Sequence, residues 1–237
     1  MINCQWISPN YKTEDESDTV KYNSDSLFHV LMTRLADAMI LNILFIITSL
    51  PIITIGVSWA SMYYVTLKII QDEKNEEISI LKNYLHSFKQ NLLQGIEIWI
   101  LALLFGGVLF LDLRIISSME AQAFRTALFV ATGTVVLLFV LTLQFVFPYL
   151  SRFCTKFLTT IKNAALIAIA QFPRAIIMTV ITAVAVWLTI LNKYTIYTGI
   201  FFWLFIGFST IALVKARIFI RIFQDIEQNQ TKVKQKD

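Results

Sequence analysis

The sequence predicts an all-α fold, a polytopic membrane helical bundle of about six transmembrane helices with two cytoplasmic interfacial amphipathic helices. Hydrophobic residues make up 57% of the 237 residues and charged residues only 15%, and the mean hydropathy is +0.66. The apolar residues also gather in long stretches without charge. A water-soluble domain of this size could not bury so much apolar surface. The composition therefore favours an integral membrane protein.

The first uncharged stretch, residues 38–67, is divided by Pro51 and Gly56. Pro51 cannot continue the hydrogen-bonding pattern of a helix. We therefore expect two short helices, about 35–51 and 57–70, joined by a tight turn. A broken, re-entrant hairpin made of the same two helices would fit the sequence equally well.

Four further spans are predicted at residues 96–113, 126–151, 175–192 and 194–214. The last three each exceed about 17 uninterrupted apolar residues, which is enough to cross the hydrocarbon core.

The distribution of positive charge supports six spans. Of the 20 lysines and arginines, 17 then lie on one side of the membrane, and 3 lie on the other, namely Arg114, Arg125 and Lys193. If residues 57–70 did not cross, the split would be 14 to 6. Positive residues concentrate on the cytoplasmic side. We therefore expect a multi-pass protein of the bacterial cell membrane with both termini in the cytoplasm.

The two ends of the chain are polar. Residues 1–26 form an acidic tail without the features of a secretory signal, and residues 226–237 form a second polar tail. The intervening residues 27–225 are expected to form a single membrane domain. Cys4 and Cys154 are the two cysteines, and their separation indicates neither a disulfide framework nor a zinc site.

Two segments that precede spans are predicted to be amphipathic helices on the cytoplasmic side, residues 81–95 and 157–172. In the first, an apolar stripe runs opposite the lysines and comprises Leu81, Leu85, Phe88, Leu92 and Leu93. The similarity of SFKQNLL to TIKNAAL is short, so two independent interfacial helices of similar composition are the favoured interpretation and an internal repeat is the alternative.

The sequence contains no signature of an enzyme. Phosphate-binding loops of the GxxxxGK[ST] type are absent, as are HExxH, GxSxG and GxGxxG. The only histidines are His29 and His86, and neither lies within a predicted span. We expect no catalytic activity, no metal, no cofactor and no nucleic acid partner. The lipid bilayer is the partner that the composition predicts.

Polar residues within or beside spans are the remaining candidates, because they are costly in lipid unless they are paired or hydrated. Asp37 follows Arg34 by three residues, which allows an ion pair near the start of the first span. Asn42 and Gln144 lie deeper, where hydrogen bonds between helices are favoured over ligand binding. Glu97 lies at a position typical of the membrane interface.

Pro173 and Arg174 mark a break between the second amphipathic helix and the span that follows. The guanidinium of Arg174 is available to lipid phosphate headgroups, which is the favoured interpretation, or to a partner protein.

Several segments resemble a known family. They are NILFIITSLPIITIGVSWASMYYVTLKIIQDE, YLHSFKQNLLQGIEIW, FPYLSRF and IKNAALIAIAQFPRAII. Together they resemble the YesL-like family of bacterial membrane proteins, domain of unknown function 624. The most specific parts are residues 50–56, 63–68 and 87–91, which include Pro51, Gly56, Tyr64, Lys68, Lys89 and Asn91. The resemblance extends over about residues 27–225.

The resemblance implies a role beside carbohydrate uptake but no established activity and no catalytic residues. We therefore expect an accessory or assembly subunit that binds permease subunits of a carbohydrate ABC importer. Two alternatives are an independent sugar or small-solute transporter, with Asp37, Asn42 and Gln144 lining its cavity, and a membrane regulator of glycan utilisation.

Overall fold

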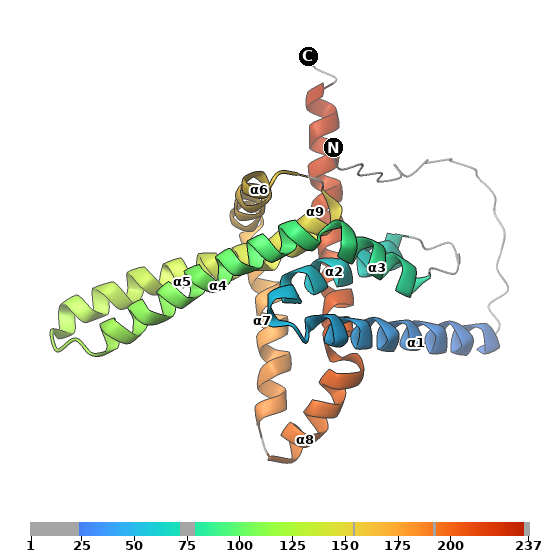
Figure 1. Cartoon of the computed structure of the whole chain (residues 1–237), viewed down its shortest axis with the longest axis horizontal. Coiled ribbons are helices and arrows are strands. Elements are labelled where there is room, and N and C mark those ends of the chain that lie inside the picture. Colours follow the sequence, from blue (N-terminus) through green and yellow to red (C-terminus); the bar gives the residue numbers. More distant parts are fainter. Residues whose placement is uncertain (1–23, 72–78, 154, 192, 235–237) are drawn as a thin grey trace.

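The computed structural model describes residues 24–71, 79–153, 155–191 and 193–234, and this part of the chain is helical without strands (Figure 1). Its elements are α1 Ser24–Ser49, the 3₁₀ turn η1 Ile52–Thr54, α2 Ile55–Gln71, α3 Ile80–Gln90, α4 Leu92–Ser117, α5 Gln122–Arg152, α6 Phe157–Ala170, α7 Phe172–Ile190, α8 Lys193–Phe202, the π-helical segment η2 Trp203–Gly207, and α9 Phe208–Lys234.

Six helical segments in the described residues are long and apolar enough to cross a membrane. They are Met32–Ser49, Ile52–Gln71, Leu92–Ser117, Gln122–Arg152, Phe172–Ile190 and Tyr194–Asp225. The predicted fold class is therefore confirmed, and the protein is a multi-pass membrane protein. Phe157–Ala170 is a shorter apolar helix.

The centre of the fold is α2, in which eleven of the 17 residues are buried. It packs against α1, α3, α4, α5 and α9. Phe219 of α9 connects it to α5, because its ring lies edge-on to Tyr63 at 5.5 Å and to Phe145 at 5.2 Å. The span that contains α2 thus organises the core, whereas the longer helices α4 and α5 carry much of the exposed apolar surface.

Close contact of two glycines sets the crossing of α2 over α4. A Cβ atom at Gly95 would lie 2.8 Å from a methyl carbon of Val57, and one at Gly56 would lie 2.8 Å from Trp99 Cβ. The interpretation of Gly56 as part of the break is therefore wrong, because Gly56 is the second residue of α2. Its lack of a side chain serves packing, and the turn itself lies around Pro51.

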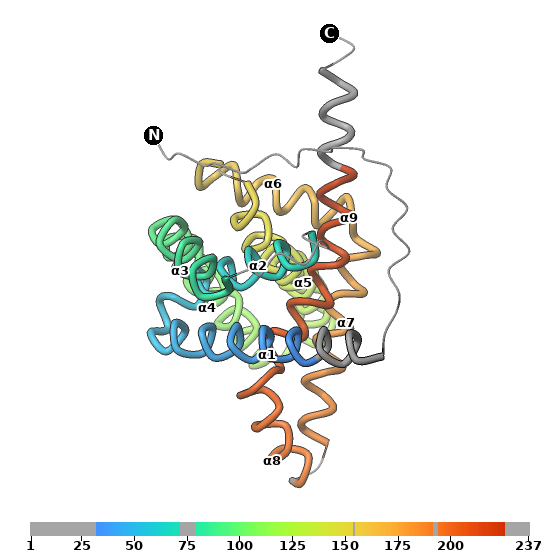
Figure 2. Tube along the Cα trace, turned by 90° about the vertical axis from the view of Figure 1, so that its right-hand side faces the viewer, coloured from blue at the N-terminus to red at the C-terminus, as the bar shows by residue number. Residues whose placement is uncertain are grey.

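Two helical hairpins extend from this body. The α4–α5 hairpin projects to the left in Figure 1, whereas the hairpin of α7 with α8 and η2 projects downward. In Figure 2 the hairpin that carries α8 again extends below the body, and α4 and α5 are seen nearly end-on. Buried residues of α7 are confined to its base, at Ala175 and Met178. The outer parts of both hairpins therefore present apolar side chains on most of their surface.

A one-residue elbow joins each amphipathic helix to the span that follows it. Asn91 has φ −98° and ψ 6°, and Gln171 has φ −109° and ψ 32°. Both elbows keep helix-like hydrogen bonds on either side, from Asn91 N to Ser87 O and from Gln171 N to Ile167 O. The single helix predicted at 81–95 is consequently divided between α3 and α4.

The order of amphipathic helix, elbow, long helix, turn and long helix occurs twice in the described chain, from α3 to α5 and from α6 to α9. The register differs from the one indicated by the sequence. Residues 87–93 straddle the first elbow, whereas residues 160–166 lie within α6. The architecture is repeated, but SFKQNLL and TIKNAAL occupy different places in it.

The remaining differences concern helix ends. The second break lies at Gln171, and Pro173 stands in the first turn of α7, where its missing N–H is not needed.

The span predicted at 194–214 continues as α9 to Lys234, so residues 226–234 of the predicted polar tail are helical. Similarly, α1 begins within the predicted N-terminal tail, at Ser24. The rest of that tail, with Cys4, and also Cys154, lie outside the described residues.

Candidate functional site

A polar junction of Gln144, Thr179 and Lys215 joins α5, α7 and α9. Lys215 Nζ donates a hydrogen bond of 3.3 Å to Gln144 Oε1, and Thr179 Oγ1 lies 3.3 Å from the same oxygen. Gln144 Nε2 donates to the carbonyl oxygen of Ala175 at 3.2 Å. One amide thus connects three helices at the base of the α7–α8 hairpin.

Lys215 is buried, with 7% of its surface exposed. Arg152, with 8% exposed, is the other buried charged residue of the described chain, and its guanidinium carbon lies 5.4 Å from the ring centre of Phe223. The described core therefore contains two cations and no carboxylate. Burying a charge without an opposite charge is strongly unfavourable. The polar junction buries the ammonium group of Lys215 without a carboxylate among the described core residues.

The sequence alone does not mark Lys215 as a core residue, because this lysine directly follows the predicted span 194–214, where a position on the cytoplasmic side is expected. In the structure α9 continues through position 215, and the side chain of Lys215 is buried inside the bundle. The signal that could have found it is the continued helical spacing of apolar residues after it, at Ala216, Phe219, Ile220 and Phe223.

The base of α7 is also held by an ion pair at the surface. Arg174 donates to Asp225 Oδ2 at 3.2 Å, and both side chains are exposed by about half. The structure thus gives Arg174 a partner on α9. Pro173, next to it, is exposed.

A second polar group, the hydroxyl cluster, surrounds the turn between α1 and α2. The hydroxyls of Thr48 and Tyr84 share a hydrogen bond of 2.6 Å, and Ser58 Oγ donates to Thr48 Oγ1 at 2.9 Å. Thr54 Oγ1 donates to Thr48 O at 2.6 Å and Pro51 O at 2.7 Å. Burial raises the pKa of the Tyr84 phenol to about 12. The cluster fixes α3 to the turn.

Asn42 is completely buried and hydrogen-bonds to the backbone of another helix. Its amide nitrogen donates to the carbonyl oxygens of Trp203 at 2.9 Å and Leu204 at 2.7 Å, and its Oδ1 accepts from the N–H of Ser209 at 3.1 Å. These are backbone groups at the irregular π-helical segment η2, where helical hydrogen bonding is perturbed. Asn42 therefore has an interhelical role and is separate from Gln144.

The other predicted positions do not form one site. Lys68 Nζ donates to Asn83 Oδ1 at 3.0 Å, and Asn91 Nδ2 donates to Ser87 O at 3.0 Å, so both brace α3. Asp37 and Tyr64 are half-buried in α1 and α2. Among the described residues no ion pair joins Asp37 to Arg34. The side chains of Arg34, Lys89 and Glu97 are exposed.

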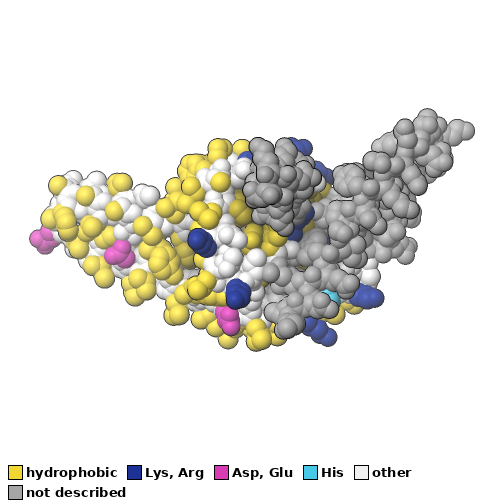
Figure 3. Space-filling view, turned by 90° about the horizontal axis from the view of Figure 1, so that it is seen from above, with side chains coloured by type: hydrophobic (Ala, Val, Ile, Leu, Met, Phe, Trp, Pro, Cys, Tyr) yellow, Lys and Arg dark blue, Asp and Glu magenta, His cyan; other side chains and the backbone are white. Residues whose placement is uncertain are grey.

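Lysines and arginines lie over the body on the face seen in Figure 3, whereas the projecting arm at the left is largely hydrophobic. The amphipathic helices contribute to this pattern. In α3, the exposed side chains combine leucines with basic residues and include Leu81, Lys82, Leu85, His86 and Lys89. The face of α3 that packs on the body is a different one, built around Ile80, Tyr84 and Ser87.

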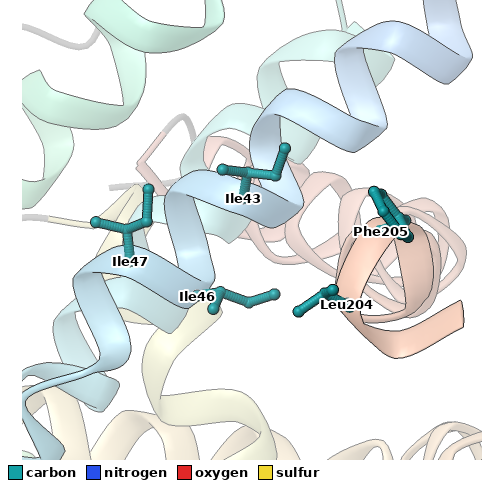
Figure 4. Close-up of a pocket in the computed structure, with 5 residues that line it drawn as sticks. All are labelled: Ile43, Ile46, Ile47, Leu204 and Phe205. Carbon is teal, nitrogen blue, oxygen red and sulfur yellow. The ribbon is translucent and has the colours of Figure 1, made fainter. Parts of the chain in front are cut away.

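An open apolar groove of about 270 Å³ lies between α1 and η2 (Figure 4). Ile43, Ile46 and Ile47 line it from α1, and Leu204 and Phe205 line it from η2. It contains no polar side chain with which to orient a ligand. Within the described residues, no group of three or more His, Cys, Asp or Glu side chains could hold a metal ion.

The central part of the fold can be compared with known families. Residues 38–113 match the family described as protein of unknown function, DUF624. The family resemblance is thereby confirmed over this region. The DUF624 match extends from α1 into α4 and includes the hydroxyl cluster and the Gly56–Gly95 contact. The polar junction lies outside it. No curated protein and no solved structure matches the chain.

Proposed function

We propose that the protein is a non-enzymatic accessory or assembly subunit of a carbohydrate ABC importer. In this proposal its two hairpins bind permease helices within the cell membrane. The observation that carries it is the contrast between a compact body around α2 and hairpins whose outer parts pack only within themselves. In the most apolar window of α5, 6% of the residues are buried, compared with 61% for α2.

Exposed apolar helices suit either lipid or the helices of a partner. Gly107 in α4 and Gly133 in α5 support the second use, because small residues allow a close approach of another helix. A Cβ atom added at Gly107 or at Gly133 would have no neighbour within 4 Å among the described residues. The α4–α5 hairpin thus has glycine positions that no described side chain of this protein covers.

The proposed orientation places both termini, α3 and α6 in the cytoplasm and the two hairpin tips outside. It rests on the 17 to 3 distribution of positive residues. It gives α3 and α6 equivalent places at the cytoplasmic interface and is compatible with the repeated order of elements.

The experiment is affinity purification of the tagged full chain from native membranes of cells grown on different glycans, after mild crosslinking. Co-purification of importer permease subunits is expected, and it should decrease when Gly107 and Gly133 are replaced by leucine. Replacing the packed Gly95 is unsuitable as a test because it would disturb the body. Recovery of the protein alone under every growth condition would contradict the proposal.

An independent transporter is the second candidate, and the polar junction is the observation that favours it. Polar groups buried between spans are where substrates bind in many transporters. The structure does not assemble Asp37, Asn42 and Gln144 into one cavity, so such a site would have to centre on Lys215. Reconstituted protein that moved a sugar across liposome membranes, with loss of movement in K215Q, would favour this candidate over the accessory subunit.

A further inference from the structure

The ammonium group of Lys215 uses only part of its hydrogen-bonding capacity. It has three N–H donors, and within the described chain it makes one hydrogen bond, to Gln144 Oε1. That acceptor is neutral and lies near the Thr179 hydroxyl as well. The charge of Lys215 is therefore neither neutralised nor fully solvated by the groups that surround it.

The helices that build the polar junction cannot supply the missing negative charge. Neither α5 nor α7 contains an aspartate or glutamate. In α9 the first acidic residue is Asp225, which lies about 15 Å from Lys215 along the helix axis at 1.5 Å per residue. Asp225 is also paired with Arg174 at the surface. An anion at the junction must come from outside the three helices.

We infer that the polar junction is a binding site for a phosphate group. Lys215 would supply the charge, as lysines do in many phosphate sites. The second N–H of the Gln144 amide is the neutral donor placed to orient a phosphate oxygen, because the Thr179 hydroxyl already donates its proton to the carbonyl oxygen of Ala175 at 2.9 Å. The phosphate belongs either to an anionic lipid or to a soluble ion, and these two sources share the same chemistry.

Access to Lys215 depends on α7. The buried residues of this helix are confined to Ala175 and Met178, and its described polar links to the body are those of the junction and the Arg174–Asp225 pair. The inferred route of the phosphate to Lys215 is therefore an outward movement of α7, because few contacts hold the base of this helix. The site is independent of the accessory function proposed above, since it lies at the base of a hairpin and not along its outer surface.

The test uses the purified full chain in maltoside micelles, which contain no phosphate. The temperature of half-unfolding is measured at constant ionic strength while inorganic phosphate is added in one arm and phosphatidylglycerol in the other. The variants are K215Q and, as the matched control, K162Q, which removes an exposed lysine of α6. A further variant, Q144E, places a carboxylate beside Lys215 inside the protein.

A saturable rise in the unfolding temperature of the wild type and K162Q is expected in one of the two arms, and the arm identifies the source. K215Q should require at least about tenfold more ligand for the same rise, because the charge-assisted hydrogen bonds are lost. Q144E should be stabilised without ligand and should no longer respond to it. Absence of a rise in both arms, or an unchanged response in K215Q or Q144E, would overturn the inference. If K215Q does not fold, the response of Q144E to the two ligands still tests the inference.

Discussion

The hydroxyls of Thr48 in α1 and Tyr84 in α3 lie 2.6 Å apart and join a transmembrane helix to an amphipathic one. Ser58 of α2 donates to the same threonine oxygen, so three helices meet at this point. Tyr84 is completely buried. Its hydrogen bond is therefore expected to contribute to the stability of the body and to hold α3 in place.

Replacing Tyr84 by phenylalanine keeps the ring but removes the hydroxyl. Y84F should lower the free energy of unfolding by about 1 kcal/mol, with a larger loss where Thr48 and Ser58 are left without a compensating partner. Chemical denaturation in micelles measures this, with Y197F at an exposed tyrosine as the control. Equal stability of Y84F and wild type would show that the cluster does not hold α3.

The raised pKa of Tyr84 makes stability depend on pH in the alkaline range. The phenol ionises near pH 10 when unfolded and at about 12 in the native protein. Above pH 10 the unfolded state therefore loses this proton first, and the free energy of unfolding falls by up to about 2 kcal/mol as the pH approaches 12. Below pH 10 the contribution is complete. Y84F should show a shallower decline over the same window, and parallel curves for the two proteins would argue against a buried neutral phenol.

The contact of Gly95 with Val57 predicts a steric effect. G95A should destabilise the protein by about 1–3 kcal/mol, because the added methyl group overlaps Val57 and the α2–α4 crossing must widen. G107A on the same helix is the control, and a stability equal to or slightly above that of the wild type is expected because no atom of the described residues lies within 4 Å of the new methyl carbon.

Combining G95A with V57A tests the cause. The smaller side chain at position 57 should restore part of the lost stability, so that the two substitutions are not additive. If the losses in the free energy of unfolding were additive, the destabilisation by G95A would not arise from its contact with Val57.

Asn42 is expected to be required for the irregular segment η2. N42A removes hydrogen bonds to Trp203, Leu204 and Ser209 and leaves backbone groups unsatisfied in an apolar environment, which should cost about 2–4 kcal/mol. The fluorescence of Trp203 should also change, because its carbonyl is one of the acceptors. T134A, at an exposed threonine, is the control, and an unchanged stability of N42A relative to it would refute the interhelical role.

The sequence was sufficient to predict the spans because long runs without charge are visible directly. It was less informative where a helix continues past such a run. Lys215 follows 21 uncharged residues, 194–214, which predicts a position at the membrane surface, yet α9 carries this lysine into the core. A single sequence shows helical spacing but does not show which helix faces the lysine.

Two other features depended on contacts between distant segments. The proximity of Pro51 predicts a turn at Gly56, whereas contacts with Gly95, Trp99 and Phe147 determine the role of this glycine. The elbow at Asn91 has no proline or glycine to mark it, since the helix-like hydrogen bonds continue on both sides. Such features follow from packing and are not encoded in local propensity.

The orientation of the six spans is the central claim, because the places of α3, α6 and both hairpins follow from it. Single cysteines in a C4S/C154S background test it directly, with S118C at the tip of the α4–α5 hairpin and K89C on α3. A membrane-impermeant maleimide applied to intact cells should label S118C and should label K89C only after the membrane is permeabilised. Labelling of K89C in intact cells, or protection of S118C, would contradict the account.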